Sequence, residues 1–351
     1  MSIITMHPLE KEIAAIMRAE SLLAPGEAVV AGISGGPDSV ALLHVLAALA
    51  PVFGTKIIAV YVDHGLRPEE TGKEKELVAM QACALGADFA TCRVDVHGEA
   101  ARRKISIEHA ARDLRYDFFD RVAQQHLAGK IAVAHTADDQ AEEVLLRLIR
   151  GTGRAGLSGM RMMRDGRLIR PFLTTAKEQL LAYLAEKGIP FLLDSSNLRR
   201  EYLRNRVRLD LLPYLLEFNP NIGQTLRQTA AVLQDEEAVL AALTEQAWQD
   251  LVPVDRGNAA QGLPVVAVEL ASFLALERGI RRRIAEKVFI VLGSQPQYKK
   301  IEQILSVAAN GETGARLHFS RGLRMKKERQ WLVFSYPQGQ IACRGDLEEG
   351  D

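Results

Sequence analysis

The stretch Ala28-Val29-Val30-Ala31-Gly32-Ile33-Ser34-Gly35-Gly36-Pro37-Asp38-Ser39 links an apolar, β-rich run to a helical pattern that begins at Val40. Gly35 and Gly36 let the backbone turn sharply and approach a ligand closely, because they carry no side chain. Pro37 suits the first turn of a helix, where its missing N–H costs nothing. Free backbone N–H groups at the start of that helix favour an anion. The stretch therefore predicts a strand–loop–helix site for phosphate.

The six residues Ser-Gly-Gly-Pro-Asp-Ser at positions 34–39 resemble the pyrophosphate loop of the N-type ATP pyrophosphatases. The resemblance implies an enzyme that cleaves ATP between its α- and β-phosphates and transfers AMP. A Walker-type NTPase is disfavoured, because the stretch lacks the Gly-Lys-Ser/Thr ending of the common P-loop. The plain alternative is a tight turn followed by an ordinary helix N-cap, and the strand–loop–helix context favours the phosphate site over it.

Size and composition favour a soluble protein of two or three domains. The chain has 351 residues with ordinary apolar and charged fractions, so it can bury substantial cores. We expect no membrane partner, because there is no bilayer-spanning apolar run and no secretory signal at residues 1–20. None of the cysteines lies in a Cys-x-x-Cys pair, which argues against zinc and a redox dithiol. A cytoplasmic protein is therefore expected.

Charge is unevenly distributed along the chain, although 44 basic residues balance 44 acidic ones. Residues 147–210 contain 14 Lys and Arg against 6 Asp and Glu, and residues 278–329 contain 13 against 4. Between them, residues 211–277 contain 2 against 9. Two basic blocks around an acidic one predict two cationic surfaces that hold a polyanion such as a nucleic acid. The alternative is that these charges form ordinary solvated helix faces.

Strand and helix patterns alternate through the first part of the chain, which predicts an α/β fold with a doubly wound, mostly parallel sheet. After the run that begins at Ala28, strands are expected at residues 56–63, 88–95 and 130–135, and helices at 9–23, 38–49, 70–86, 106–127, 144–150, 175–188 and 221–250. Asn219-Pro220 marks a boundary. We expect a catalytic domain at residues 1–217 and a smaller, mainly helical domain at residues 218–351 that ends in short antiparallel strands.

Two of the predicted strands end in residues suited to metal and proton chemistry. Asp63 and His64 follow one strand, and the segment 135–142, with His135, Asp139 and Glu142, follows another. Ligands bind at the carboxyl ends of strands in such a sheet, so both groups should face a nucleotide. Imidazole and carboxylates there suit Mg²⁺ and proton transfer beside a triphosphate.

Each of these groups also has a structural explanation. Asp63 and His64 fit an ordinary turn equally well. Asp138 or Asp139 fits a helix N-cap, with Glu142 completing a capping box. The gathering of all these residues at one predicted edge of the sheet favours function.

Arginines dominate the segment that follows. Seven lie between residues 147 and 170, around the run 151–160, which is too rich in glycine for regular structure. Such a loop beside an ATP site suits clamping phosphates or covering a nucleic acid. Farther on, Arg204 and Arg208 share one helical face, and Arg206 points elsewhere. Either phosphate contact or salt bridges to the acidic block explains these cations, and phosphate contact is favoured.

Taken together, the segments resemble the bacterial tRNA(Ile)-lysidine synthetases over residues 28–220, with a weaker likeness of residues 221–335 to the helical middle domain of that family. The motifs are Ser-Gly-Gly-Pro-Asp-Ser (34–39), Val-Asp-His-Gly-Leu-Arg (62–67), His-Thr-Ala-Asp-Asp-Gln-Ala-Glu (135–142), Arg-Gly-Thr-Gly-Arg-Ala-Gly-Leu-Ser-Gly-Met (150–160), Arg-Pro-Phe-Leu (170–173), Asp-Ser-Ser-Asn (194–197) and Arg-Asn-Arg-Val-Arg (204–208). The first motif marks only the superfamily, whereas the combination is specific to this family. Glu143 departs from the pattern, because members often have Thr there.

The resemblance implies a two-step reaction on the wobble cytidine of the isoleucine tRNA with a CAU anticodon. The C2 oxygen of the base attacks the α-phosphate of ATP, and pyrophosphate leaves. The ε-amine of free L-lysine then displaces AMP, which leaves lysidine. The resemblance thus implies ATP, lysine and this tRNA as substrates, Mg²⁺ as the metal, and a homodimer as a possible assembly.

The resemblance also assigns roles to residues. The pyrophosphate would be held by Ser34, Gly35, Gly36, Pro37, Asp38 and Ser39, with Asp63 and His64 beside the nucleotide. Asp38 and Glu142 would bind Mg²⁺, and Arg206 would steady the charge on the α-phosphate. The proton that lysine's amine must lose would go to His135, Asp139 or Glu142, among which the sequence does not choose. The tRNA contacts are expected at Arg150, Arg154, Arg204, Arg208 and Arg282.

Other functions remain open at this point. A tRNA thiolase uses the same adenylation, but that chemistry usually needs cysteines, and Cys83 and Cys92 are poorly placed for it. An amide-forming synthetase acting on a small molecule would not require two basic blocks. A non-catalytic nucleotide-binding or tRNA-binding module would bind ATP or tRNA without releasing AMP and pyrophosphate.

Overall fold

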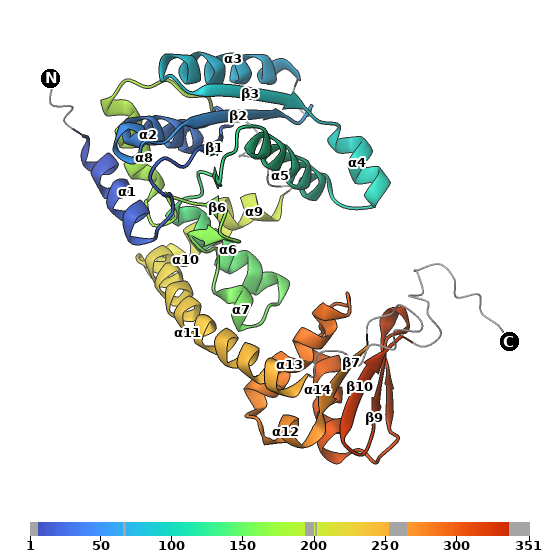
Figure 1. Cartoon of the computed structure of the whole chain (residues 1–351). Helices are drawn as coiled ribbons and strands as arrows, with labels where there is room; N and C mark the ends of the chain where they lie inside the picture. Colours follow the sequence, from blue (N-terminus) through green and yellow to red (C-terminus); the bar gives the residue numbers. More distant parts are fainter. Residues whose placement is uncertain (1–5, 66–67, 194–199, 201, 253–264, 337–351) are drawn as a thin grey trace. The chain divides into compact units, whose positions relative to one another are not determined.

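The computed structural model describes residues 6–65, 68–193, 200, 202–252 and 265–336. The chain divides into two compact units, residues 1–234 and 235–351 (Figure 1). The division falls inside helix α11 (Ile222–Leu251). The boundary expected from the sequence, between residues 217 and 218, lies at the end of the preceding helix, α10 (Leu212–Phe218). Among the described residues, no helix is both long and apolar enough to pass through a lipid bilayer.

The first unit is built on a six-stranded sheet with the order β3-β2-β1-β4-β6-β5. The strands are β1 (Val29–Gly32), β2 (Ile57–Asp63), β3 (Asp88–Arg93), β4 (Lys130–Ala132), β5 (Met163–Arg164) and β6 (Leu168–Ile169). All neighbouring pairs are parallel except β5 and β6. The predicted α/β fold with a mostly parallel sheet is confirmed.

The strand order reverses at β1, and this reversal decides where a ligand can bind. The chain runs outward from β1 to β2 and β3, and then returns to place β4 on the other side of β1. Val29 of β1 accordingly lies between Ile57 of β2 and Lys130 of β4. In open α/β sheets the helices on the two sides diverge at such a point, which leaves a crevice outside the carboxyl ends of the strands. The predicted phosphate loop follows β1, and the predicted acidic cluster follows β4.

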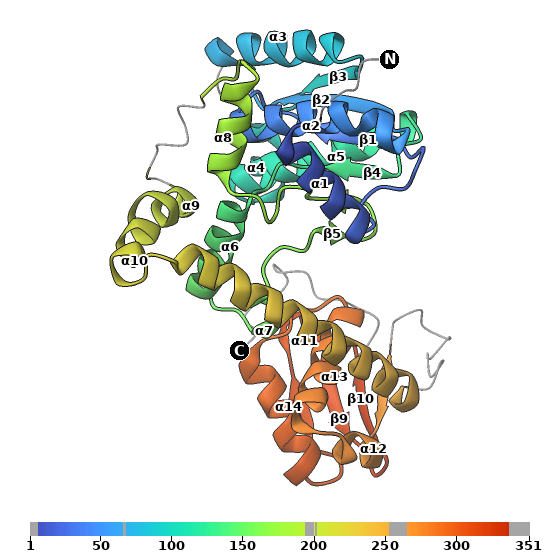
Figure 2. The ribbon, with the colours of Figure 1, turned by 90° about the vertical axis from the view of Figure 1, so that its left-hand side faces the viewer.

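Helices cover the two faces of this sheet (Figure 2), and an apolar core lies between the sheet and the helices on each face. One core contains Val29 and Ala31 of β1 together with buried residues of α1 (Pro8–Ala19), α2 (Pro37–Phe53) and α8 (Lys177–Glu186). The other contains Val30 together with Phe119 and Val122 of α5 (Ile107–Gln125). Successive strand residues point to opposite faces, so strands covered on both sides must be apolar throughout. Burial on both faces thus explains why the strand segments of the sequence are apolar without interruption.

Several local features differ from the sequence-based expectation. Between β3 and α5 lies α4 (Val96–Arg103), which the sequence analysis did not predict; Asp95 caps its start. Helix α6 spans Ala137–Arg150 and therefore begins well before the predicted residue 144. The glycine-rich run was expected to be irregular, yet it contains the short helix α7 (Arg154–Leu157). Helix α3 (Pro68–Ala84) agrees with its prediction to within two residues.

A single helical run contains α9 (Leu203–Arg206), a π-helical turn η2 (Val207–Leu211) and α10. The sequence predicts a helix running toward Pro213, and the run continues past it. Proline lacks a backbone N–H, and its ring clashes with the carbonyl four residues earlier in a regular α-helix. A wider turn relieves this conflict. In this structure the N–H of Leu212 donates to the carbonyl of Val207, five residues back.

The second unit packs helices against a four-stranded antiparallel sheet with the order β7-β10-β9-β8. Its elements are β7 (Val266–Glu269), α12 (Leu270–Ala275), α13 (Arg278–Val291), α14 (Tyr298–Asn310), β8 (Arg316–His318), the short turn η3 (Ser320–Gly322), β9 (Arg324–Lys327) and β10 (Trp331–Ser335). Phe273, Phe289 and Phe334 are buried in its core. The predicted short terminal strands are confirmed.

Replacing Gly32 at the end of β1 with alanine should destabilise the first unit. A Cβ at this position would lie 2.5 Å from Cζ of the buried Phe119. Overpacking of this kind costs about 1–3 kcal/mol of unfolding free energy, which chemical denaturation measures. The matched control is Gly72→Ala on α3, where the added methyl meets no atom within 4 Å. Equal stabilities of the two variants would contradict the close packing of α5 on β1.

Candidate functional site

The loop after β1 is held in shape by its own serines. The backbone N–H of Ser34 donates to Oγ of Ser39 at 3.1 Å, and Oγ of Ser39 donates to the carbonyl of Gly36 at 2.9 Å. Gly35 has a φ of 88°, the left-handed conformation that glycine adopts without strain. Gly36 is the N-cap of α2 with no side chain over the helix end, and Pro37 follows it as predicted. The first N–H groups of α2 are therefore open toward an anion.

Asp38, in the first turn of α2, meets a cation that the sequence did not suggest. Nζ of Lys177 donates to Oδ2 of Asp38 at 3.2 Å, and the backbone N–H of Lys177 donates to Oδ2 of Asp138 at 2.8 Å. The other carboxylate oxygen of Asp38, Oδ1, is buried and accepts no hydrogen bond from the described residues. Burial raises the pKa of Asp38 above its ordinary value despite the attraction of Lys177. This carboxylate can therefore accept a further cation.

The segment after β4 begins α6 with a capping box. The side chain of Thr136 accepts from the N–H of Asp139 at 3.3 Å, and Oδ2 of Asp139 accepts from the N–H of Thr136 at 2.9 Å. The N-cap is thus Thr136, and neither Asp138 nor Asp139 takes that position. Asp139 completes the box, which the sequence analysis assigned to Glu142. One oxygen of Asp139 is left for other partners.

Asp139, Glu142, Arg204 and Arg208 form one network of two carboxylates and two guanidiniums. Arg204 donates to Asp139 at 2.8 Å and to Glu142 at 3.1 Å, and Arg208 donates to Asp139 at 3.3 Å and to Glu142 at 2.5 Å. Glu142 is almost fully buried. Burial alone would raise the pKa of Asp139, but Arg204, His135 and the other donors around it lower the pKa. The network balances two positive charges against two negative ones.

This network corrects the predicted setting of Arg204 and Arg208. The two do share a helical face, as expected, but that face is turned onto Asp139 and Glu142 of the same unit. Their side chains are about 30% exposed, at 28% and 31%. Salt bridges to the acidic block, the alternative considered for these arginines, are not what Arg204 and Arg208 form; Arg283 makes such a contact instead, donating to Glu237 at 2.8 Å within the second unit.

His135 lies beside the network in an electropositive environment. Nε of Arg170 donates to Nδ1 of His135 at 3.3 Å. Burial, with the positive charges of Arg170, Arg204 and Arg115 nearby, lowers the pKa of His135 to about 4. The ring is therefore neutral at physiological pH, with Nδ1 as acceptor and Nε2 carrying the proton. This state fits a hydrogen-bond donor better than a proton acceptor.

A second cluster of arginines surrounds Tyr116 on α5. The guanidiniums of Arg112, Arg115 and Arg164 lie over its ring at 5.2, 5.6 and 5.6 Å from the centroid. Such contacts attract cations to the electron-rich face of the ring. Because Arg115 also acts on the pKa of His135, this cluster extends the positive field at the end of β4.

The remaining predicted residues lie in varied settings. Oδ1 of Asp63 accepts from the N–H of Gly65 at 2.7 Å, so Asp63 with His64 forms the turn that the sequence allowed as an alternative. Arg206 is not brought to the acidic network; it lines a pocket with apolar residues, described below. Arg150 is exposed at the end of α6, and Arg154 begins α7.

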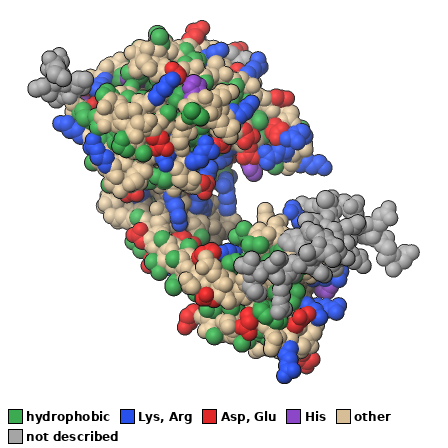
Figure 3. Space-filling view, in the orientation of Figure 1, with side chains coloured by type: hydrophobic (Ala, Val, Ile, Leu, Met, Phe, Trp, Pro, Cys, Tyr) green, Lys and Arg blue, Asp and Glu red, His purple; other side chains and the backbone are tan. Residues whose placement is uncertain are grey.

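Arg282 belongs to the second unit, 5.0 Å from the ring centroid of Tyr298 and 3.6 Å from a carboxylate oxygen of Glu302. The predicted motif residues 66–67 and 194–197 lie outside the described residues. The two basic blocks are thus partly neutralised. Figure 3 shows this mixing of charges on one face of the molecule, where Lys and Arg side chains lie among Asp and Glu side chains on both units.

The sequence analysis missed two residues of the site. Arg170 is almost fully buried and donates to both His135 and the carbonyl of Arg161. The sequence analysis noted the motif Arg-Pro-Phe-Leu (170–173) but assigned no role to Arg170. Lys177 carried no signal, because it lies 139 residues from Asp38 along the chain.

Known proteins match this chain in sequence and in fold. A family model for the PP-loop domain matches residues 6–215. The tRNA(Ile)-lysidine synthase of Bacillus subtilis is 32% identical over 337 residues, which cover 94% of this chain and 70% of that protein. The tRNA(Ile)-lysidine synthase of Geobacter sulfurreducens is 32% identical over 350 residues, covering 98% and 73%. Among solved structures, a U34-tRNA thiolase from Methanococcus maripaludis has a TM-score of 0.52 at 17% identity, covers 64% of this chain and 79% of its own, and supports the fold alone.

Glu142→Gln should lower the free energy of unfolding by about 3–5 kcal/mol, because it leaves two partly buried guanidiniums without their full counter-charge. Equilibrium denaturation measures the loss. The control is Asp88→Asn, whose partner Lys56 is 62% exposed at the protein surface. That change should cost less than about 1 kcal/mol. Equal losses would show that the buried network does not hold α9 against α6.

The pKa of His135 predicts a pH dependence of stability. As the pH falls from 6.5 toward 4, the unfolded chain takes up a proton at this position while the folded protein does not. The contribution of His135 to the unfolding free energy therefore decreases over this range. In the variant His135→Gln, which cannot titrate, unfolding should depend less on pH between 6.5 and 4. Identical pH profiles of the two proteins would contradict the buried, neutral ring.

Proposed function

This chain belongs to the tRNA(Ile)-lysidine synthase family, and we propose that it ligates free L-lysine to C2 of the wobble cytidine of tRNA(Ile) with a CAU anticodon, using ATP. One observation carries the proposal. The phosphate loop after β1 and the charged network after β4 lie at the two neighbouring strands where the sheet order reverses. A nucleotide in that crevice would meet both groups.

The reaction has two displacement steps. The C2 oxygen of the cytosine attacks the α-phosphate of ATP, which forms an adenylated base and releases pyrophosphate. The ε-amine of lysine then attacks C2, and AMP leaves with the former C2 oxygen. Both steps gain from positioning and from stabilising negative charge on phosphate oxygens. The first N–H groups of α2 and the ammonium of Lys177 would hold the departing pyrophosphate.

The residues fit Mg²⁺ at Asp38 but not at Glu142. The unpaired buried oxygen of Asp38 can face a cation, and Mg²⁺ commonly binds one or two carboxylates plus substrate phosphates. Both oxygens of Glu142 already accept hydrogen bonds from Arg204 and Arg208. When bound, the metal would neutralise charge on the triphosphate. Glu142 would instead orient the two arginines.

Arg204 and Arg208 replace Arg206 as the cations proposed to act on the α-phosphate. They lie next to Asp139 after β4, whereas Arg206 points away from that network. For the proton of the lysine amine, His135, Asp139 and Glu142 stay the predicted acceptors; in this structure each of them already accepts a hydrogen bond from an arginine.

The alternatives have less support. Cys83 is exposed on α3, and Cys92 lies on β3, where burial raises the pKa of its thiol. Within the described part of the chain, no three potential metal ligands of the Cys, His, Asp or Glu type come together. A thiolase site is therefore not supported by these residues. A homodimer stays a prediction.

The direct test is an omission experiment with labelled ATP and labelled lysine. AMP and lysine-labelled RNA should form only when ATP, lysine and the tRNA with a CAU anticodon are present together, whereas pyrophosphate should already form with ATP and this tRNA. AMP released with tRNA but without uptake of lysine would mean that another nucleophile is used. No AMP under any combination would make the protein a binding module and end the proposal.

Asp38→Asn should lower the rate of AMP formation at least 100-fold while leaving the fold intact. The neutral amide keeps the shape of the side chain but binds Mg²⁺ poorly, and it removes a buried charge that the protein does not fully solvate. Circular dichroism and the AMP assay measure the two effects. The control is Asp165→Asn at an exposed turn, which should be fully active. Full AMP formation by Asp38→Asn would contradict the metal role.

A further inference from the structure

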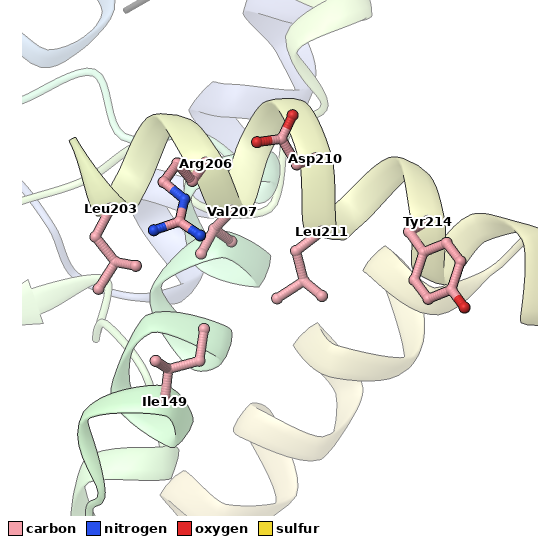
Figure 4. A pocket seen from close by; sticks show the side chains of 7 residues that line it. All are labelled: Ile149, Leu203, Arg206, Val207, Asp210, Leu211 and Tyr214. Carbon is pink, nitrogen blue, oxygen red and sulfur yellow. The ribbon is translucent and has the colours of Figure 1, made fainter. Parts of the chain in front are cut away.

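The helical run that holds Arg204 and Arg208 also forms an open pocket of about 350 Å³ (Figure 4). Val207 and Leu211 of the π-helical turn line it from one side, and Ile149 of α6 lines it from another. Arg206 reaches into it from a position between Arg204 and Arg208 in the sequence, so its side chain points away from theirs. The pocket and the acidic network therefore lie on two sides of one helix.

The surface around this pocket is strongly apolar and aromatic. Tyr214 is 56% exposed, Phe218 is 71% exposed, and their rings meet edge to face at 5.1 Å between centroids. Ile149 is 51% exposed. Exposed apolar groups that gather in one place usually mark a binding surface. Two exposed aromatic rings beside a pocket provide faces on which a planar group can stack.

Unpaired arginines at and near the pocket favour a partner with negative charge, whereas the acidic lining residue Asp210 is paired with Arg200. Arg206, which lines the pocket, and Arg150, which follows the lining residue Ile149 on α6, are both exposed, and neither has an ion-pair partner among the residues that the structure describes. Arg147, Arg204 and Arg208 on the same elements are all paired with carboxylates. Unpaired guanidiniums next to exposed aromatic rings are typical of sites for single-stranded nucleic acid, which offers phosphates and stacked bases.

We infer that this pocket receives a nucleobase of the anticodon loop that lies next to the reacting cytidine. The base stacks on Tyr214, and its flanking phosphates contact Arg206 and Arg150. Asp210, at the pocket and 47% exposed, pairs with Arg200 through Oδ1, so its other carboxylate oxygen can accept from the edge of the base, and Arg206 offers donors. A helix with its side chains is about 10–12 Å wide, so one or two unstacked nucleotides can span from the network to the pocket. The inference rests on the proposed function and adds a second contact to the same RNA.

The test is a double-mutant cycle between the protein and an anticodon stem-loop RNA, with binding measured by fluorescence anisotropy. The protein variant is Tyr214→Ala, and the RNA variants carry an abasic nucleotide at each position flanking the reacting cytidine in turn. Tyr214→Ala should weaken binding of the intact RNA about 5- to 150-fold, the range for loss of one base–aromatic stack. One abasic position should cause a similar loss with the unmodified protein and no further loss with Tyr214→Ala. Losses that multiply at every position would overturn the inference.

Three further variants sharpen the result. Tyr214→Phe keeps the ring and should bind like the unmodified protein. In a plot of the logarithm of the RNA-binding constant against the logarithm of the salt concentration, Arg206→Ala should make the slope shallower by about one. Met80→Ala, an equally exposed apolar residue on α3, should change nothing. If Tyr214→Ala left RNA binding unchanged and instead shifted the sedimentation coefficient, the patch would be a contact between copies of the chain and the inference would be wrong.

The pocket assignment and the proposed reaction can fail independently of each other. If the unmodified protein incorporates lysine but the abasic positions show no coupling to Tyr214, only the pocket assignment fails. If the unmodified protein binds the stem-loop with coupling to Tyr214 but incorporates no lysine, the pocket assignment stands and the reaction does not.

Discussion

Two carboxylates and two guanidiniums, largely shielded from water, form a network of ion pairs at the edge of the sheet where β4 ends. Asp139 and Glu142 come from α6, and Arg204 and Arg208 come from a helical run more than 60 residues later. Removing charges from water costs more than their attraction usually returns, so such a network rarely adds stability by itself. We expect it instead to favour one relative position of the two helices. Apolar contacts among Leu145, Leu146 and Val207 then close the same interface.

The position of this network follows from the topology of the sheet. Because β4 returns beside β1, the acids after β4 lie next to the phosphate loop after β1. A nucleotide bound there would meet backbone donors and Lys177 at one end and two arginines at the other. Burial, together with the positive charges near the end of β4, keeps His135 neutral, with a pKa of about 4. The site is thus suited to developing negative charge on a phosphate more than to proton abstraction by imidazole.

The features that could be predicted from the sequence are those that depend on residues close together along the chain. The strand–loop–helix stretch, the alternation of strands and helices, and the acids after the fourth strand were all visible, because each has its own period or local motif. The helical face shared by Arg204 and Arg208 was visible for the same reason. What those arginines contact was not visible, since the partner carboxylates lie about 65 residues away and only packing brings them together. Lys177 at Asp38 and the π-helical turn before Pro213 likewise depend on tertiary structure that no local pattern records.

The most direct test of the account follows an oxygen atom. If the C2 oxygen of the wobble cytidine attacks the α-phosphate, that oxygen must leave with AMP when lysine takes its place. A tRNA carrying oxygen-18 at C2 of this cytidine should therefore yield AMP that contains one oxygen-18 atom, measured by mass spectrometry after one round of reaction. AMP without the label, or label retained in the RNA after lysine has been joined, would contradict adenylation of the base at this site.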